Sequence, residues 1–138
     1  MQVDNRFLRV GVYGILIQNN QVLMTITQSG SRLIYNFPGG GVEQNEGLAQ
    51  TLIRECKEEL DVSIIIQDRI YTAKNLYINP DFPNSYMFNL YYSITLQNNE
   101  SITMSDAKWF PINNLPINEM LEIDKEFAAA YLQNIEKK

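Results

Sequence analysis

Three glutamates, Glu55, Glu58 and Glu59, stand three and four residues apart within one charged segment. On a helix, residues at i, i+3 and i+4 project from a common face, so their carboxylates should converge. Like charges at these spacings repel one another, which should raise the pKa of at least one glutamate. A divalent cation would reverse the repulsion. Mg²⁺ suits such a site because it takes oxygen ligands from one or two carboxylates, waters and substrate phosphates.

The three consecutive glycines that precede this segment are a second chemical feature. Gly39, Gly40 and Gly41 let the backbone approach a ligand closely, and a carbonyl oxygen there could face the same ion. The alternative is a plain turn requirement, because Pro38 and three glycines cannot continue regular strand pairing. Both interpretations place a loop before the glutamates.

The chain of 138 residues contains no histidine and one cysteine, Cys56. This composition excludes an internal disulfide, a zinc site built from thiolates or imidazoles, and the Ser-His-Asp and Cys-His catalytic pairs. Cys56 lies on an apolar helical stripe with no histidine to activate it, which favours core packing. Any metal must therefore be held by oxygen, and proton transfer falls to carboxylates, lysine or tyrosine.

The net charge of −5 limits the classes of partner. A grip on nucleic-acid backbone needs clustered Lys and Arg, so no stable nucleic-acid complex is expected. No stretch reaches the roughly 18 apolar residues of a membrane span, and residues 1–10 carry charges in place of a signal-peptide core. We expect a cytoplasmic protein with a small-molecule partner and no membrane partner, and a homodimer is compatible with the sequence.

Hydrophobic periodicity predicts the elements that position these side chains. Beyond Gly47, the expected N-cap, apolar residues recur at helical spacing: Leu48, Ala49, Leu52, Ile53, Cys56 and Leu60. A second stripe predicts a C-terminal helix: Phe127, Ala128, Tyr131, Leu132 and Ile135. Strands are expected at residues 10–18 and 21–28, joined as a hairpin at Asn19-Asn20, and at residues 32–37, 62–67, 69–78, 85–96 and 108–111. The sequence predicts a single α+β domain, residues 1–138, with helices on both faces of a sheet.

The spacing G-x5-E-x7-R-E-U-x-E-E-x-G-U, the Nudix box, matches six positions of the chain: Gly40, Glu46, Arg54, Glu55, Glu58 and Glu59. The chain thus resembles the MutT-like Nudix hydrolase family, and its YNFPGGG and KWFPINNLP segments are similar to flanking segments of that family. Two positions depart from the box. Cys56 replaces an aliphatic residue, and Asp61 replaces the last glycine, where the helix is expected to end in a left-handed turn.

The resemblance implies the Nudix fold, an α/β/α sandwich around a mixed β-sheet. It also implies Mg²⁺-dependent hydrolysis, with Mn²⁺ as a substitute, of a pyrophosphate bond in a nucleoside diphosphate linked to another moiety X. The implied metal ligands are Glu55, Glu58 and Glu59 with the Gly39 carbonyl oxygen. Glu46 and Arg54 would form an ion pair that holds the glycine loop against the helix.

The resemblance also implies a further carboxylate before the late Trp segment, either Glu100 or Asp106, and substrate contacts are expected from it and from Gly40 and Gly41. Either acid could instead be an exposed loop residue. Aromatic residues that could stack on a nucleobase, or pack in the core, are Tyr35, Tyr86, Phe88 and Tyr92. Residues 77–85 are expected to read X. The general base is open among Glu55, Glu58, Glu59, Glu100 and Asp106.

Two other function classes compete with the enzyme. One is a non-catalytic Nudix domain that binds a nucleotide as a sensor, although a sensor need not keep the full glutamate set. The other is an interaction protein whose acidic helix is a solvated face. The sequence leaves X open among nucleoside triphosphates, ADP-ribose, dinucleoside polyphosphates and capped RNA.

Overall fold

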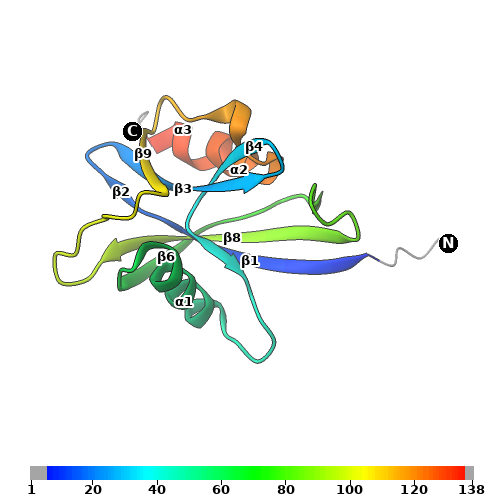
Figure 1. Cartoon of the computed structure of the whole chain (residues 1–138), viewed down its shortest axis with the longest axis horizontal. Coiled ribbons are helices and arrows are strands. Elements are labelled where there is room, and N and C mark those ends of the chain that lie inside the picture. The colour runs from blue at the N-terminus through cyan, green and yellow to red at the C-terminus, as the bar shows by residue number, and fades with distance from the viewer. Residues whose placement is uncertain (1–5, 136–138) are drawn as a thin grey trace.

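The computed structural model describes residues 6–135, which form two β-sheets held between helices. Helix α1 (Leu48–Leu60) covers one face of the larger sheet, and the C-terminal helices lie at the opposite end of the molecule (Figure 1). This arrangement confirms the predicted α+β class with helices on two sides of the strands. No helix within residues 6–135 is long and apolar enough to cross a membrane.

The larger sheet is mixed, as the α/β/α sandwich requires. Its strands lie in the order β5 (Gly39–Gly41), β1 (Phe7–Ile15), β8 (Ser85–Leu96) and β6 (Ile64–Thr72), and β7 (Tyr77–Ile78) also pairs with β8. Strands β1 and β8 run parallel along the whole of β1, whereas the other pairs are antiparallel. Parallel pairing joins segments far apart in the sequence, and it places β1 at the centre of the sheet.

The smaller sheet is antiparallel and consists of β2 (Ile17–Gln18), β3 (Gln21–Ser29), β4 (Arg32–Asn36) and β9 (Ala107–Pro111). The predicted turn at Asn19-Asn20 is confirmed, with both residues at positive φ. The predicted long hairpin is wrong, because only the two-residue strand β2 pairs with β3 across this turn. The first six residues of the run, 10–15, belong to β1, which has neighbours on both edges and therefore no free edge for β3.

The predicted strand at residues 69–78 is wrong as a single unit. Strand β6 joins its beginning to the predicted strand at residues 62–67, and the chain then turns before β7. The Glu126 carboxylate holds this turn, because it accepts hydrogen bonds from the Lys74 backbone N–H at 3.0 Å and from the Tyr71 and Tyr77 hydroxyls at 2.7 and 3.0 Å. The predictions for residues 32–37, 85–96 and 108–111 are confirmed to within one residue.

Helix α1 begins and ends as predicted. Gly47 is its N-cap, and Asp61 adopts the left-handed conformation at φ 54° and ψ 42°, where Lys57 Nζ lies 3.0 Å from Asp61 Oδ1. The buried residues are Thr51, Leu52, Cys56 and Leu60. Leu48, Ala49 and Ile53 of the predicted stripe are exposed, since the helix meets the sheet mainly along every fourth residue. Burial raises the pKa of the Cys56 thiol to about 12, which confirms core packing.

The C-terminal helix is confirmed, with a π-helical turn inside it. A short 3₁₀ turn (Ile117–Glu119) precedes α2 (Glu122–Phe127), the π turn (Ala128–Leu132) and α3 (Gln133–Ile135). The Phe127 ring stacks on Tyr91 of β8 at a centroid distance of 4.2 Å and meets the Phe37 ring edge-on at 5.4 Å. This aromatic cluster fills the space between the two sheets and the C-terminal helices.

Candidate active site

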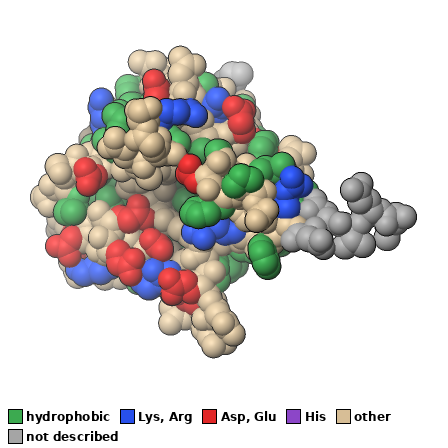
Figure 2. Space-filling view, turned by 45° about the vertical axis from the view of Figure 1, so that its right-hand side comes forward, with side chains coloured by type: hydrophobic (Ala, Val, Ile, Leu, Met, Phe, Trp, Pro, Cys, Tyr) green, Lys and Arg blue, Asp and Glu red, His purple; other side chains and the backbone are tan. Residues whose placement is uncertain are grey.

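A cleft of about 370 Å³ opens beside β5, and α1, β1 and the segment around residue 81 contribute to its walls. Glu55 and Glu59 of α1 line it together with Gly39 and Gly40. Figure 2 shows acidic side chains gathered low on one face of the molecule, with Lys and Arg side chains among them. The structure thus brings four residues of the predicted site to one cavity, Gly39, Gly40, Glu55 and Glu59, whereas Gly41 is not among the residues that line it.

Glu59 is tied directly to the glycine strand. Its Oε1 accepts a hydrogen bond from the Gly39 backbone N–H at 3.1 Å. Gly39 has a φ of 144°, and a Cβ there would collide with the Val12 carbonyl oxygen, so only glycine fits this position. Burial raises the pKa of Glu59 to about 7, the Gly39 N–H opposes that rise, and the charge of Glu55 adds to it. The predicted rise is confirmed in direction, but burial outweighs mutual repulsion as its cause.

Glu55 approaches the same strand through space that glycine leaves open. An added Cβ at Gly40 would lie 2.7 Å from Glu55 Cδ, closer than nonbonded carbon atoms approach. The Glu55 side chain is 20% exposed, and its Oε1 accepts a hydrogen bond from Arg54 Nη1 at 3.1 Å. The predicted loop is wrong at the glycine run, because Gly39–Gly41 pairs with β1 as strand β5, and its missing side chains admit two carboxylates to the backbone.

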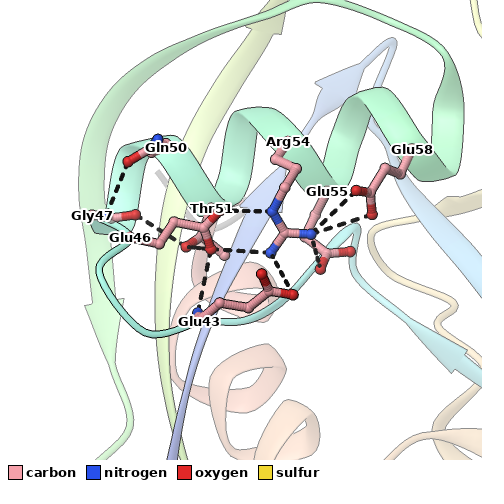
Figure 3. A network of polar contacts seen from close by, with 8 residues as sticks. All are labelled: Glu43, Glu46, Gly47, Gln50, Thr51, Arg54, Glu55 and Glu58. Atoms are coloured by element: carbon pink, nitrogen blue, oxygen red, sulfur yellow. Dashed lines mark hydrogen bonds and ion pairs between the residues drawn. The ribbon is translucent and has the colours of Figure 1, made fainter.

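Arg54 is the centre of a polar network on α1 (Figure 3). Its Nε and Nη2 donate to the two carboxylate oxygens of Glu46 at 2.7 and 3.0 Å, which is the predicted ion pair in a two-point geometry. The Thr51 hydroxyl donates to Glu46 Oε1 at 2.6 Å. The hydrogen bond from Arg54 lowers the pKa of Glu46 to about 2. These contacts fix the segment before the helix onto its first turns.

Glu58 is turned away from the cleft. Arg54 Nη1 lies 3.3 Å from both oxygens of Glu58, and the Glu58 side chain is 58% exposed. The expectation that three carboxylates converge therefore holds for Glu55 and Glu59 alone. Within residues 6–135, no three acidic or cysteine side chains are already gathered as a metal site. Two cleft carboxylates still fit Mg²⁺, because this ion usually takes one or two of them together with water and phosphate oxygens.

The NUDIX domain family model matches residues 7–131, and this range covers almost the whole chain. The chain belongs to the Nudix family. A MutT protein from Methanosarcina mazei has a similar structure, with a TM-score of 0.73 and 16% sequence identity over 96% of this chain and 98% of that one. This similarity confirms the predicted Nudix fold.

Two curated relatives are named for their reactions. The chain is 27% identical to an ADP-ribose pyrophosphatase of Methanocaldococcus jannaschii over 78% of its own length and 64% of the relative. It is 36% identical to an 8-oxo-dGTP diphosphatase of Buchnera aphidicola over 39% of its own length and 43% of the relative. The chain thus spans less than two thirds of either relative.

Outside the Nudix box, the structure does not bring several predicted residues to the cleft. Glu100 Oε2 accepts a hydrogen bond from the Ser63 backbone N–H at 2.6 Å, which ties residues beyond β8 to the chain after α1. Asp106 is exposed away from the cleft lining. The Tyr35 ring packs edge-on against Phe110 at 4.9 Å. None of the other proposed stacking residues lines the cleft either: Tyr86, Phe88 and Tyr92.

Sequence reasoning missed Arg9, Tyr13 and Asn89, which line the cleft from the large sheet. The Arg9 guanidinium lies against Gly41, where an added Cβ would be 2.6 Å from Cζ. Among the described lining residues, Arg9 is the only Lys or Arg. Alternation along β1 was the available signal for Arg9 and Tyr13, because it sets both side chains on the face opposite Val12. Three residues of the predicted reader segment also line the cleft: Asn79, Asp81 and Phe82.

The buried Glu59 predicts a pH-dependent stability of the metal-free protein. Its folded pKa of about 7 lies above the ordinary 4.5, so Glu59 contributes stability that is fully present below pH 4.5 and is lost as the pH rises through 7. Glu59→Gln should therefore lose less free energy of unfolding across this window than the wild type. Urea denaturation in EDTA below and above the window measures the difference.

Burial also raises the pKa of Asp124 to about 7, so Asp124 gives the stability a pH dependence in the same direction. Asp124 is present in both the wild type and Glu59→Gln. The comparison between them thus isolates Glu59. Glu43→Gln is the matched control, because the Glu43 side chain is 71% exposed. An identical pH dependence in wild type and Glu59→Gln would show that Glu59 has an ordinary pKa.

Proposed function

We propose that this Nudix protein hydrolyses a pyrophosphate bond in a nucleoside diphosphate linked to another moiety, with Mg²⁺ or Mn²⁺ as the cofactor. The observation that supports it most is the shared cleft of Glu55, Glu59, the bare glycine strand and Arg9. Both relatives named for a reaction act on nucleotides through a pyrophosphatase or diphosphatase activity. The cytoplasmic location, the homodimer and the lack of a nucleic-acid partner stay predictions.

The residues that would hold the cation are Glu55 and Glu59, joined by Glu58 if it leaves Arg54, and by the Gly39 carbonyl oxygen. When bound, a divalent cation neutralises phosphate charge and acidifies a water molecule. Glu59 is also placed to remove a proton where it does not itself ligate the cation, since a bound cation would lower the pKa of about 7 that burial gives it. Arg54 and Glu46 act as positioning residues, since their contacts hold the glutamate helix against the preceding loop.

The other end of the cleft would bind the organic part of the substrate. Arg9 supplies positive charge for a phosphate beside the glycine strand. Phe82 is 65% exposed while it lines the cleft, so its ring is available to stack on a nucleobase. The Ser29 hydroxyl donates to Asp81 Oδ1 at 2.6 Å and ties this segment to the end of β3. Residues 79–82 are therefore the proposed reader of X.

A substrate panel tests the proposal. ADP-ribose, a nucleotide sugar, a dinucleoside polyphosphate, the nucleoside triphosphates and 8-oxo-dGTP are incubated with the protein and Mg²⁺, and released phosphate and mononucleotide are measured. We expect cleavage of at least one substrate between two phosphorus atoms, and EDTA should stop it. Nucleotide binding without turnover on the whole panel would instead identify a sensor.

A further inference from the structure

The polar side chains of Asn89 and Tyr13 lie beside Gly11 in the wall of the cleft. Gly11 in β1 pairs with Gly41 in β5 on one side and with Asn89 in β8 on the other. An added Cβ at Gly11 would lie 2.9 Å from Asn89 Oδ1 and 3.1 Å from the Tyr13 hydroxyl oxygen. The Asn89 and Tyr13 side chains therefore occupy the space that Gly11 leaves free, and both residues line the cleft.

A buried chain of hydrogen bonds, from Asn89 to Tyr91 to Asp124, fixes which end of the Asn89 carboxamide faces the cleft. Asn89 Nδ2 donates to the Tyr91 hydroxyl at 3.2 Å, and the Tyr91 hydroxyl lies 2.7 Å from Asp124 Oδ1. Tyr91 is fully buried and Asp124 is 2% exposed, with no Lys or Arg partner among residues 6–135. Above the raised pKa of Asp124, the ionised carboxylate only accepts hydrogen bonds, so Tyr91 donates to it and accepts from Asn89.

These hydrogen bonds leave the side-chain carbonyl oxygen of Asn89 as an acceptor in a fixed orientation. Because Nδ2 is committed to Tyr91, Oδ1 is the free end, and no hydrogen bond within residues 6–135 uses it. Such an oxygen recognises an N–H or O–H donor and rejects another acceptor. The neighbouring Tyr13 hydroxyl can donate or accept, and none of the hydrogen bonds of the described residues engages it.

We propose that Asn89 and Tyr13 form a hydrogen-bonding subsite for an N–H or O–H donor on the nucleoside part of the ligand, with Tyr91 and Asp124 as positioning residues. The proposal rests on the proposed function for its ligand class. Strand β5 pairs with β1 on one side and contacts Glu55 and Glu59 on the other, and the subsite and both glutamates line one cleft, so a ligand that crosses the glycine strand can reach both. The donor is either a nucleobase N–H or a sugar hydroxyl, and the two sources can be told apart by experiment.

The test measures binding without turnover. The four common nucleoside monophosphates and ribose 5-phosphate are titrated calorimetrically into the wild type, Asn89→Ala and Tyr91→Phe, in EDTA and above the pKa of Asp124. The wild type should bind at least one nucleotide, and Asn89→Ala should weaken that affinity about tenfold or more. If Asn89→Ala also weakens the binding of ribose 5-phosphate, the donor is a sugar hydroxyl. If it weakens the binding of the nucleotide alone, the donor is a nucleobase N–H.

A double-mutant cycle separates positioning from a purely structural role. If Tyr91 acts through Asn89, Tyr91→Phe should weaken nucleotide binding in the wild type and have no further effect in the Asn89→Ala background. The exposed Asn113→Ala is the control and should bind as the wild type does. Unchanged affinity in folded Asn89→Ala, or no nucleotide binding by the wild type, overturns the subsite. Mg²⁺-dependent turnover of the substrate panel tests the proposed function independently of this subsite.

Discussion

Glu59→Gln should lower turnover of the best substrate by about 10²- to 10⁴-fold, with little change in folding. The amide keeps the size of the side chain and an oxygen that can accept the Gly39 N–H. It removes the negative charge, the ligand strength toward a cation and the ability to take a proton. Glu55→Gln should show a loss of similar size, because Glu55 lines the same cleft. Initial rates at saturating Mg²⁺ measure both variants.

Glu43→Gln is the matched control for these rates. Glu43 is 71% exposed and reaches Arg54 only at 3.7 Å, so its charge can be removed with little effect on the cleft. Circular dichroism establishes that each variant is folded. Wild-type turnover in both Glu55→Gln and Glu59→Gln would show that the metal and the base lie elsewhere. Loss of turnover in Glu43→Gln would point to a general effect of charge.

The sequence correctly predicted those features of the fold that depend only on neighbouring residues. The positive φ values at Asn19, Asn20 and Asp61 follow from residue type and position, as does the N-cap at Gly47. The partner of β1 could not be predicted in this way. A turn specifies which residues are adjacent, but it does not specify that another strand pairs along the whole of β1 and takes its edge. That outcome depends on burial against α1, a contact distant in the sequence.

The residues of the candidate site show the same distinction between contacts set by sequence spacing and contacts set by distant parts of the chain. Glu55 and Glu59 were predictable because one helix places them at a fixed spacing, and Glu46 with Arg54 because the box fixes theirs. The Asn89 carboxamide reaches the cleft only through parallel pairing of β8 with β1, which no spacing reports. The orientation of Glu58 depends on competition for Arg54, which is a matter of side-chain geometry.

Divalent-cation binding to the acidic face of α1 is the central claim, and calorimetric titration of Mn²⁺ and Mg²⁺ tests it most directly. We expect saturable binding by the wild type, and binding lost in the Glu55→Gln/Glu59→Gln double variant, because both cleft carboxylates then lack charge. Glu43→Gln should bind as the wild type does. The wild type should also gain thermal stability from the cation, since a ligand of the native state stabilises it by mass action. No binding by the wild type, or undiminished binding by the folded double variant, would contradict the claim.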